Sequence, residues 1–118
     1  NQAADELALQ AQATADNQVT PVTFKKMVVN IYSEGTRLRY LDAEIGLQPF
    51  SESQKENLKK AEFLLQDALI EIAGKMSPEE LGSVTGKILL EDRLKKKLNE
   101  KFGATIIKQI YFSRFVVQ

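Results

Sequence analysis

The chain contains no cysteine and no histidine. Without cysteine it can form no disulfide bond and no thiolate nucleophile or metal ligand. Without histidine, Ser-His and Cys-His catalytic pairs and histidine-ligated zinc sites are excluded within these 118 residues. We therefore expect no metal and no cofactor, and a small soluble enzyme is the least favoured functional class.

Long hydrophobic runs and an overall charge are also missing. No stretch approaches the roughly 20 apolar residues that a membrane-spanning helix needs, and no signal peptide is visible. The 16 basic and 16 acidic residues cancel, so nothing draws the whole chain toward nucleic acid or anionic lipid. The charge is unevenly spread, however: residues 1–20 carry only acids, whereas basic residues dominate from Arg93 onward. The run Lys95–Lys97 is expected to be the solvated face of a helix.

The first segment differs from the rest in composition. Residues 1–16 are rich in Ala, Gln and Leu, which favour a helix. Its apolar stripe is narrow (Ala4, Leu7, Ala8, Ala11), so the helix is marginal alone and should either pack on something else or be frayed. Residues 17–23, which contain Pro21, are predicted to be a linker. Residues 24–118 are predicted to form a single domain.

Two strands open the predicted domain. The spacing of apolar residues predicts strands over 24–32 and 37–47, joined by residues 33–36, in which Gly35 supplies the positive φ of a hairpin. The second strand alternates, with Asp42, Glu44 and Gly46 on the solvated side, and Pro49 ends it. The residues predicted to face the core are Leu41, Ala43, Ile45 and Leu47.

Helices are predicted next. Ser51 precedes Gln54 by three residues, and Ser53 precedes Glu56 by three, as in a capping box. A helix is predicted to follow and to end at Gly74. Ser77-Pro78-Glu79-Glu80 signals a short second helix that ends near Gly82. A third helix is predicted from about Val84 to Phe102, closed by Gly103. The core-facing stripes comprise Leu58, Ala61, Leu65, Ala68, Leu69, Ile72 and Met76 in the first helix, and Leu90, Leu94, Leu98 and Phe102 in the third.

The last fifteen residues, ATIIKQIYFSRFVVQ, are typical of a strand because β-branched and aromatic residues dominate. Simple alternation places Ile106, Ile110, Phe112 and Val116 on one face and Ile107, Tyr111, Phe115 and Val117 on the other. Such a strand would need a cover on both faces, from helices, a neighbouring subunit, or one of each. The element order predicts an α+β fold with helices over a small antiparallel sheet, made of the N-terminal hairpin and the C-terminal strand.

Candidate chemical sites are few. Asp42/Glu44 and Glu91/Asp92 are carboxylate pairs, but the first lies on a strand face expected to be solvated and the second diverges on a helix. Residues 82–87, GSVTGK, lack the spacing of a phosphate-binding loop and are better explained as a helix start.

Arginine and aromatic residues suggest an interface instead. Arg37, Arg39 and Tyr40 begin the second strand, and Arg114 and Phe115 lie in the last one. These residue types are enriched at protein interfaces. A solvated strand end explains the first group equally well, and a sheet-edge or cross-strand salt bridge explains Arg114. Leu7 and Ala11 of the N-terminal helix are further interface candidates.

Three blocks of the sequence resemble a known family in the correct order. The chain ends in IYFSRFVVQ, and VVNIYSEGTRLRYLDAEIGL (28–47) contains an Arg-Tyr-Leu that leads a second strand. Residues 80–103, ELGSVTGKILLEDRLKKKLNEKFG, contain the pattern L-x-x-x-x-Gly-Lys…Leu…Asn. Together these blocks resemble the FliL family of flagellar basal body-associated proteins, over roughly residues 24–118.

The resemblance implies a non-enzymatic scaffold with a fold similar to the stomatin-type (SPFH) membrane-band domain. It implies the periplasmic domain of a single-pass inner-membrane protein, whose cytoplasmic start and spanning helix would precede Asn1. The implied partners are further copies of the chain in a ring, the ion-driven stator units, whose activation and torque under load it would support, and the basal-body ring. No nucleic acid is implied. The alternative is a generic stomatin-type scaffold unrelated to motility.

Overall fold

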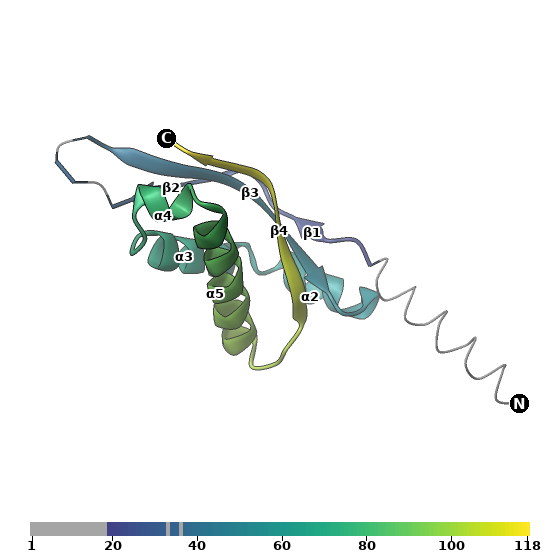
Figure 1. Ribbon diagram of the computed structural model, residues 1–118. Helices are drawn as coiled ribbons and strands as arrows, with labels where there is room; N and C mark the ends of the chain where they lie inside the picture. Colours follow the sequence, from purple (N-terminus) through teal and green to yellow (C-terminus); the bar gives the residue numbers. More distant parts are fainter. Residues whose placement is uncertain (1–18, 33, 36) are drawn as a thin grey trace, which may run out of the picture.

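The computed structural model describes residues 19–32, 34, 35 and 37–118 (Figure 1). The predicted N-terminal helix over 1–16 lies outside the described residues. The remainder has the predicted α+β architecture, with four strands in one antiparallel sheet and helices packed against it. The helices lie on the same side of the sheet (Figure 1).

The sheet is built around its longest strands. The strands are β1 (Val22–Thr23), β2 (Met27–Ile31), β3 (Arg39–Pro49) and β4 (Ile107–Val117). β3 is central: β4 runs along one side of it, and β2 and then β1 pair with the other side. Among the described residues, no strand pairs with the second edge of β4. The strand predicted over 24–32 is thus shorter, as β2 alone, and β1 lies just before it, in the segment predicted to be a linker.

The hairpin between β2 and β3 differs in length from the prediction. Ile31 pairs with Arg39, so residues 32–38 connect the strands, rather than residues 33–36. Gly35 has a φ of 88°, the positive value expected for it. The longer connection leaves Tyr32 and Leu38 exposed at the far end of the sheet.

The first predicted helix is divided. It begins with a 3₁₀ turn, η1 (Glu52–Gln54), continues as α2 (Lys55–Lys59) and resumes as α3 (Glu62–Ala73). The division falls at Lys60 and Ala61, where hydrogen bonds tighten to i→i−3 spacing. The apolar stripe nevertheless stays on the core side, because Leu58, Leu65 and Leu69 are all fully buried.

The helix caps follow the sequence closely. α4 (Pro78–Leu81) begins with a capping box: the Ser77 Oγ accepts from the Glu80 N–H (3.1 Å), and the Glu80 Oε1 accepts from the Ser77 N–H (3.4 Å). α5 (Val84–Phe102) begins at Ser83, whose Oγ accepts from the Gly86 N–H (2.9 Å). Gly103 closes α5 with a φ of 71°. The GSVTGK segment is therefore a helix start, as predicted.

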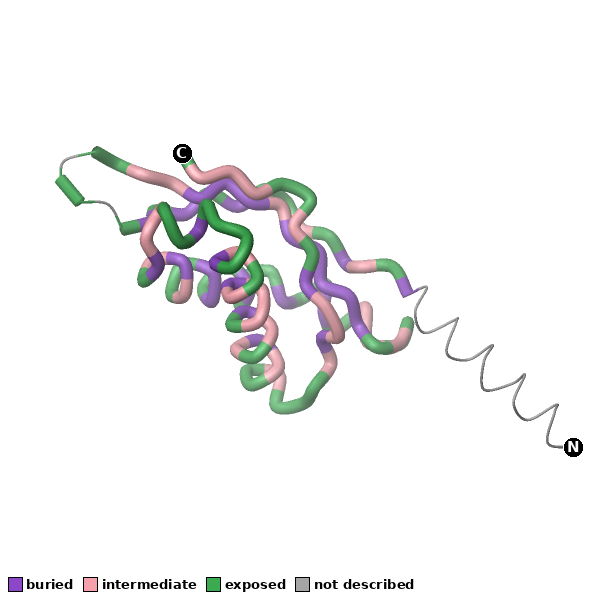
Figure 2. Tube along the Cα trace, viewed as in Figure 1, coloured by how far each residue is buried: buried purple, intermediate pink, exposed green. Residues whose placement is uncertain are grey.

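The core fills the space between the sheet and its helices (Figure 2). All four predicted inward residues of β3 are buried, as are Leu90, Leu94 and Leu98 of α5. α3 packs over β2, and α5 packs over β4 and beside α3. The two helices therefore cover opposite edges of the sheet.

The prediction for β4 was wrong about its two faces. The register shifts between Glu44 and Ile45 and between Gln48 and Pro49, which leaves Ser113 and Lys108 of β4 without an opposite residue. Each bulge reverses the alternation of side chains. As a result five apolar residues share the core-facing side with Leu41, Ala43, Ile45, Leu47 and Pro49: Ile107, Ile110, Phe112, Phe115 and Val117. β4 therefore has one mainly apolar face and not two.

Both ends of β4 are fixed to other elements. At its start, the Asn99 Oδ1 of α5 accepts from the N–H groups of Ile106 (3.0 Å) and Ile107 (2.9 Å). At its end, Tyr40 and Gln118 exchange two backbone hydrogen bonds, each 2.8 Å long. The last residue of the chain is thus part of the sheet.

Residues 19–23 differ from the predicted linker. Val19 is buried and its carbonyl oxygen accepts from the Gln48 Nε2 (2.9 Å). The same Gln48 side chain accepts from the Tyr111 hydroxyl (2.9 Å). This part of the chain is therefore packed on β3, where Pro21 also lies against Gly46.

Candidate interaction surfaces

The predicted interface residues of β3 surround the end of the chain. The Arg39 Nε donates to the Gln118 carbonyl oxygen (3.0 Å), and Tyr40 is half-buried beside it. Arg37 is exposed on the hairpin connection. Arg39 also lines a hollow of about 400 Å³ between the hairpin and α4. Arg39 and Tyr40 thus anchor the C-terminus, while Arg37 remains an untested interface candidate.

Arg114 forms the cross-strand salt bridge that the sequence left open. Its Nη2 lies 3.1 Å from the Asp42 Oδ2, and the Lys26 Nζ lies 3.8 Å from the same oxygen. The hydrogen bond from Arg114 lowers the pKa of Asp42, and the two nearby positive charges act in the same direction. The same pairing raises the pKa of the Arg114 guanidinium.

The carboxylates do not form a catalytic set. Asp42 is only 5% exposed, so the prediction that it is solvated was wrong; Lys26 and Arg114 contact it on the open side of the sheet. Glu44 accepts a hydrogen bond from the Ser113 hydroxyl (3.3 Å). Asp92 pairs with Lys96 within α5. Within the described residues, no cluster of three acids could hold a metal ion.

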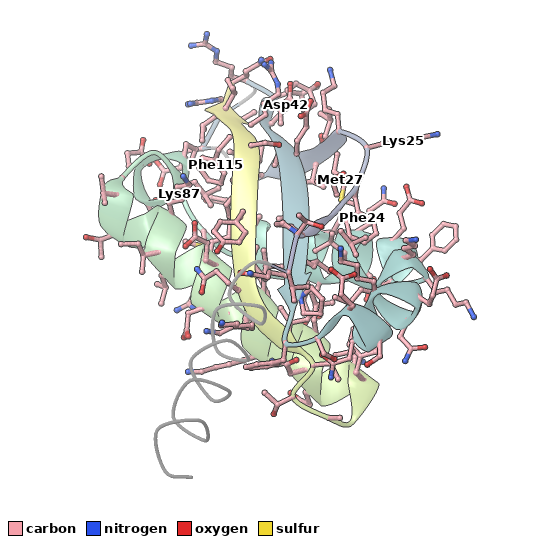
Figure 3. The ribbon with its side chains drawn as sticks, turned by 90° about the vertical axis from the view of Figure 1, so that its right-hand side faces the viewer. Phe24, Lys25, Met27, Asp42, Lys87 and Phe115 are labelled. Carbon is pink, nitrogen blue, oxygen red and sulfur yellow. The ribbon has the colours of Figure 1, made fainter. Side chains whose placement is uncertain are left out.

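Phe115 belongs to a groove between α5 and β4. Its ring meets the Phe112 ring edge-on, with centroids 4.9 Å apart, and the Lys87 Nζ lies 5.7 Å from the Phe115 centroid and 5.8 Å from the Phe112 centroid. Figure 3 shows Lys87 and Phe115 beside each other between the two elements. The α5–β4 groove has a volume of about 400 Å³ and is lined by Leu81, Gly82, Ser83, Val84, Lys87, Phe115, Val116 and Val117.

Two apolar side chains of α5 stand exposed, Val84 in the lining of this groove and Ile88 outside it. Val84 is 78% exposed and Ile88, one helical turn later, is 58% exposed. Among the described residues, Lys87 has no carboxylate within salt-bridge distance. Val84, Lys87 and Ile88 were not predicted from the sequence to be part of an interaction surface. A signal was available, because Val84 and Ile88 repeat at i, i+4 outside the buried stripe of Leu90, Leu94 and Leu98.

A second exposed apolar surface lies on α3. Phe63 is 82% exposed and Ile70 is 50% exposed, and their i, i+7 spacing places them on one line of the helix. Asp67 lies between them and is also exposed. We call Phe63, Asp67 and Ile70 the α3 ridge. Phe63 and Ile70 are apolar but lie outside the predicted core-facing stripe that begins at Leu58, and this could have indicated an exposed apolar surface from the sequence.

Two of the predicted interface residues, Leu7 and Ala11, lie outside the described residues. Their role in an interface stays a prediction. In the part of the chain that the structure describes, no helix is long and apolar enough to cross a membrane.

Comparison with known proteins identifies the family. A search of individual curated proteins found no match. The sequence model of the family described as flagellar basal body-associated protein FliL matches residues 21–118, which span every strand and helix described above. The chain therefore belongs to the FliL family of flagellar basal body-associated proteins.

Proposed function

We propose that this chain is a non-enzymatic scaffold of the flagellar motor, which assembles with its own copies around ion-driven stator units. The family match over residues 21–118 is the observation that carries the proposal. In this proposal the domain lies in the periplasm and is held beside the motor by a membrane-spanning segment that is not among these 118 residues. Its fold is proposed to be similar to stomatin-type domains, which assemble side by side.

The exposed surfaces support an assembling scaffold. The α3 ridge, and Val84 and Ile88 of α5, provide exposed large apolar side chains on two helices that pack over different strands of the sheet. Exposed apolar surfaces of this kind favour protein contacts. Two different contact surfaces on one subunit generate a ring when the rotation between neighbours closes.

The proposed mechanism is a shift in the state of the stator. A ring that binds the open, plug-released stator more tightly than the closed one increases the population of the open state. The scaffold then needs no reacting groups of its own. Its contribution is largest when the motor works against a high load, because more stator units must then stay engaged.

A deletion strain tests this proposal. We expect cells that lack the protein to assemble filaments in normal number but to swim poorly in viscous medium, and the full-length protein to restore swimming. We also expect the tagged full-length protein to retain stator proteins during purification. Unchanged swimming under load, together with no stator in the purified sample, would favour the generic stomatin-type scaffold unrelated to motility.

A further inference from the structure

The α5–β4 groove is a hollow with apolar walls, and the α3 ridge exposes apolar side chains. The groove is concave, with Phe115, Val116 and Val117 along one side and the start of α5 along the other. The ridge is a convex line of side chains on α3, led by the most exposed phenylalanine among the described residues, Phe63. An apolar ridge and an apolar-walled groove can bury each other from water, which favours their association.

Their charges are also opposite. α3 contains three acids, Glu62, Asp67 and Glu71, and no basic residue. Glu71 is held by Lys97 of α5 within the same molecule (3.2 Å). Asp67 stands on the ridge with no basic group of the described residues within salt-bridge distance, and Lys87 of the groove likewise has no acidic one. Opposite charges at matching surfaces steer binding and select the partner.

The positions of the two surfaces decide the kind of assembly. α3 covers the β2 edge of the sheet and α5 covers the β4 edge, so the ridge and the groove lie on different elements and can contact different neighbours. One subunit can then use its ridge and its groove simultaneously. Such a contact is heterologous and repeats from copy to copy.

We propose that the α3 ridge of one copy occupies the α5–β4 groove of the next copy. Asp67 pairs with Lys87, and Phe63 and Ile70 cover Val84 and Ile88. The inference deepens the proposed assembly and rests on it. A second copy fits better than another occupant because it covers both exposed apolar surfaces with one repeated contact and matches the charge of each.

Site-specific crosslinking tests the contact, and the absence of cysteine from these 118 residues keeps the background low. The full-length protein is expressed in cells as Phe63→Cys, as Val84→Cys and as the double variant, and treated with a short thiol crosslinker. We expect the double variant to give a ladder of crosslinked copies, and each single variant to remain monomeric. Crosslinked dimers from either single variant, without a ladder from the double variant, would overturn the contact.

An amine crosslinker, applied to the unaltered protein, distinguishes failure of the ridge-and-groove contact from failure of the proposed assembly. Oligomers with this reagent, but no ladder from the double cysteine variant, would refute the ridge-and-groove contact and leave the proposed assembly standing. Absence of oligomers with both reagents would refute the assembly itself.

Reversal of the charges tests the proposed ion pair between Asp67 and Lys87. We expect Asp67→Lys and Lys87→Glu each to abolish the ladder in the double cysteine background, and their combination to restore it. Glu100→Lys, an exposed change at the far end of α5, is the matched control and should leave the ladder intact. Restoration by the combined change separates loss of the contact from misfolding; failure to restore it in a folded protein would contradict the Asp67–Lys87 pairing.

Discussion

Single residues of the pattern L-x-x-x-x-Gly-Lys…Leu…Asn have distinct structural roles. Leu81 is fully buried, Gly86 allows α4 and α5 to approach closely, and Lys87 lies near two aromatic rings. The Asn99 side chain accepts hydrogen bonds from the backbone N–H groups of Ile106 and Ile107 at the start of β4. The pattern was visible in the sequence, but these roles were not, because each depends on a residue brought near by the fold.

Gly86 gives the sharpest stability prediction at this scale. A Cβ at this position would overlap the Glu80 carbonyl oxygen, which belongs to the backbone and cannot rotate away. We expect Gly86→Ala to reduce the free energy of unfolding by about 1–3 kcal/mol, the usual cost of overpacking. Urea denaturation measures the change. Thr85→Ala, at the exposed neighbouring position, is the control and should change it by about 0.5 kcal/mol or less; equal stability of the two variants would contradict the close approach.

Asp42 gives a pH-dependent prediction. Because its pKa is lowered in the folded protein by Arg114, its contribution to stability is fully present above the ordinary aspartate pKa of about 3.9. The contribution is lost as the pH falls from that value through the lower pKa of the folded state. We therefore expect Asp42→Asn to be less stable than the parent at pH 7, with a difference that shrinks in acid. Denaturation at a series of pH values measures it, and a difference independent of pH would refute the role of the charge.

At the scale of elements, local signals were predicted well and non-local ones were not. The start of α5 at Val84 and its end at Phe102, closed by Gly103, depend on a few adjacent residues, and both were predicted correctly. The faces of β4 depend on bulges at Ser113 and Lys108, which exist only in its pairing with β3. Alternation in the sequence cannot reveal such a bulge, and it therefore assigned Phe112 and Phe115 to opposite faces.

The α5–β4 groove was not predicted from the sequence, because it too depends on contacts between distant parts of the chain. It forms where the start of α5 meets the end of β4, two segments separated by most of a helix and a loop. Phe115 was a candidate because of its residue type, whereas Lys87 was noted only as part of the phosphate-loop comparison and of the family pattern, and never as an interface residue. Their proximity became visible only in the folded chain.

The end of β4 is predicted to contribute to the stability of the folded chain. Deletion of residues 116–118 removes two backbone hydrogen bonds to Tyr40, the hydrogen bond from the Arg39 Nε to the Gln118 carbonyl oxygen, and the core-facing Val117. At about 1 kcal/mol for each hydrogen bond and about 1 kcal/mol for a half-buried valine, we expect a loss of about 4 kcal/mol. Thermal and urea unfolding measure it. Gln118→Ala keeps the backbone bonds and should be nearly neutral, so a deletion as stable as this variant would contradict the account.

At the scale of the molecule, the described residues present two exposed apolar surfaces, one on α3 and one on α5, which we propose to be contact surfaces. We expect the isolated domain to associate weakly, because it lacks the proposed anchor that would raise its effective concentration in a membrane. The family match associates the chain with the flagellar basal body, and the proposed contact between ridge and groove is a specific way for its copies to join.

Electron microscopy of the full-length protein purified with its stator is the most direct test of this account. We predict closed rings around the stator, in which the α3 ridge of every subunit occupies the α5–β4 groove of its neighbour. Stator units bound by monomers, or by dimers that join two identical surfaces, would contradict it.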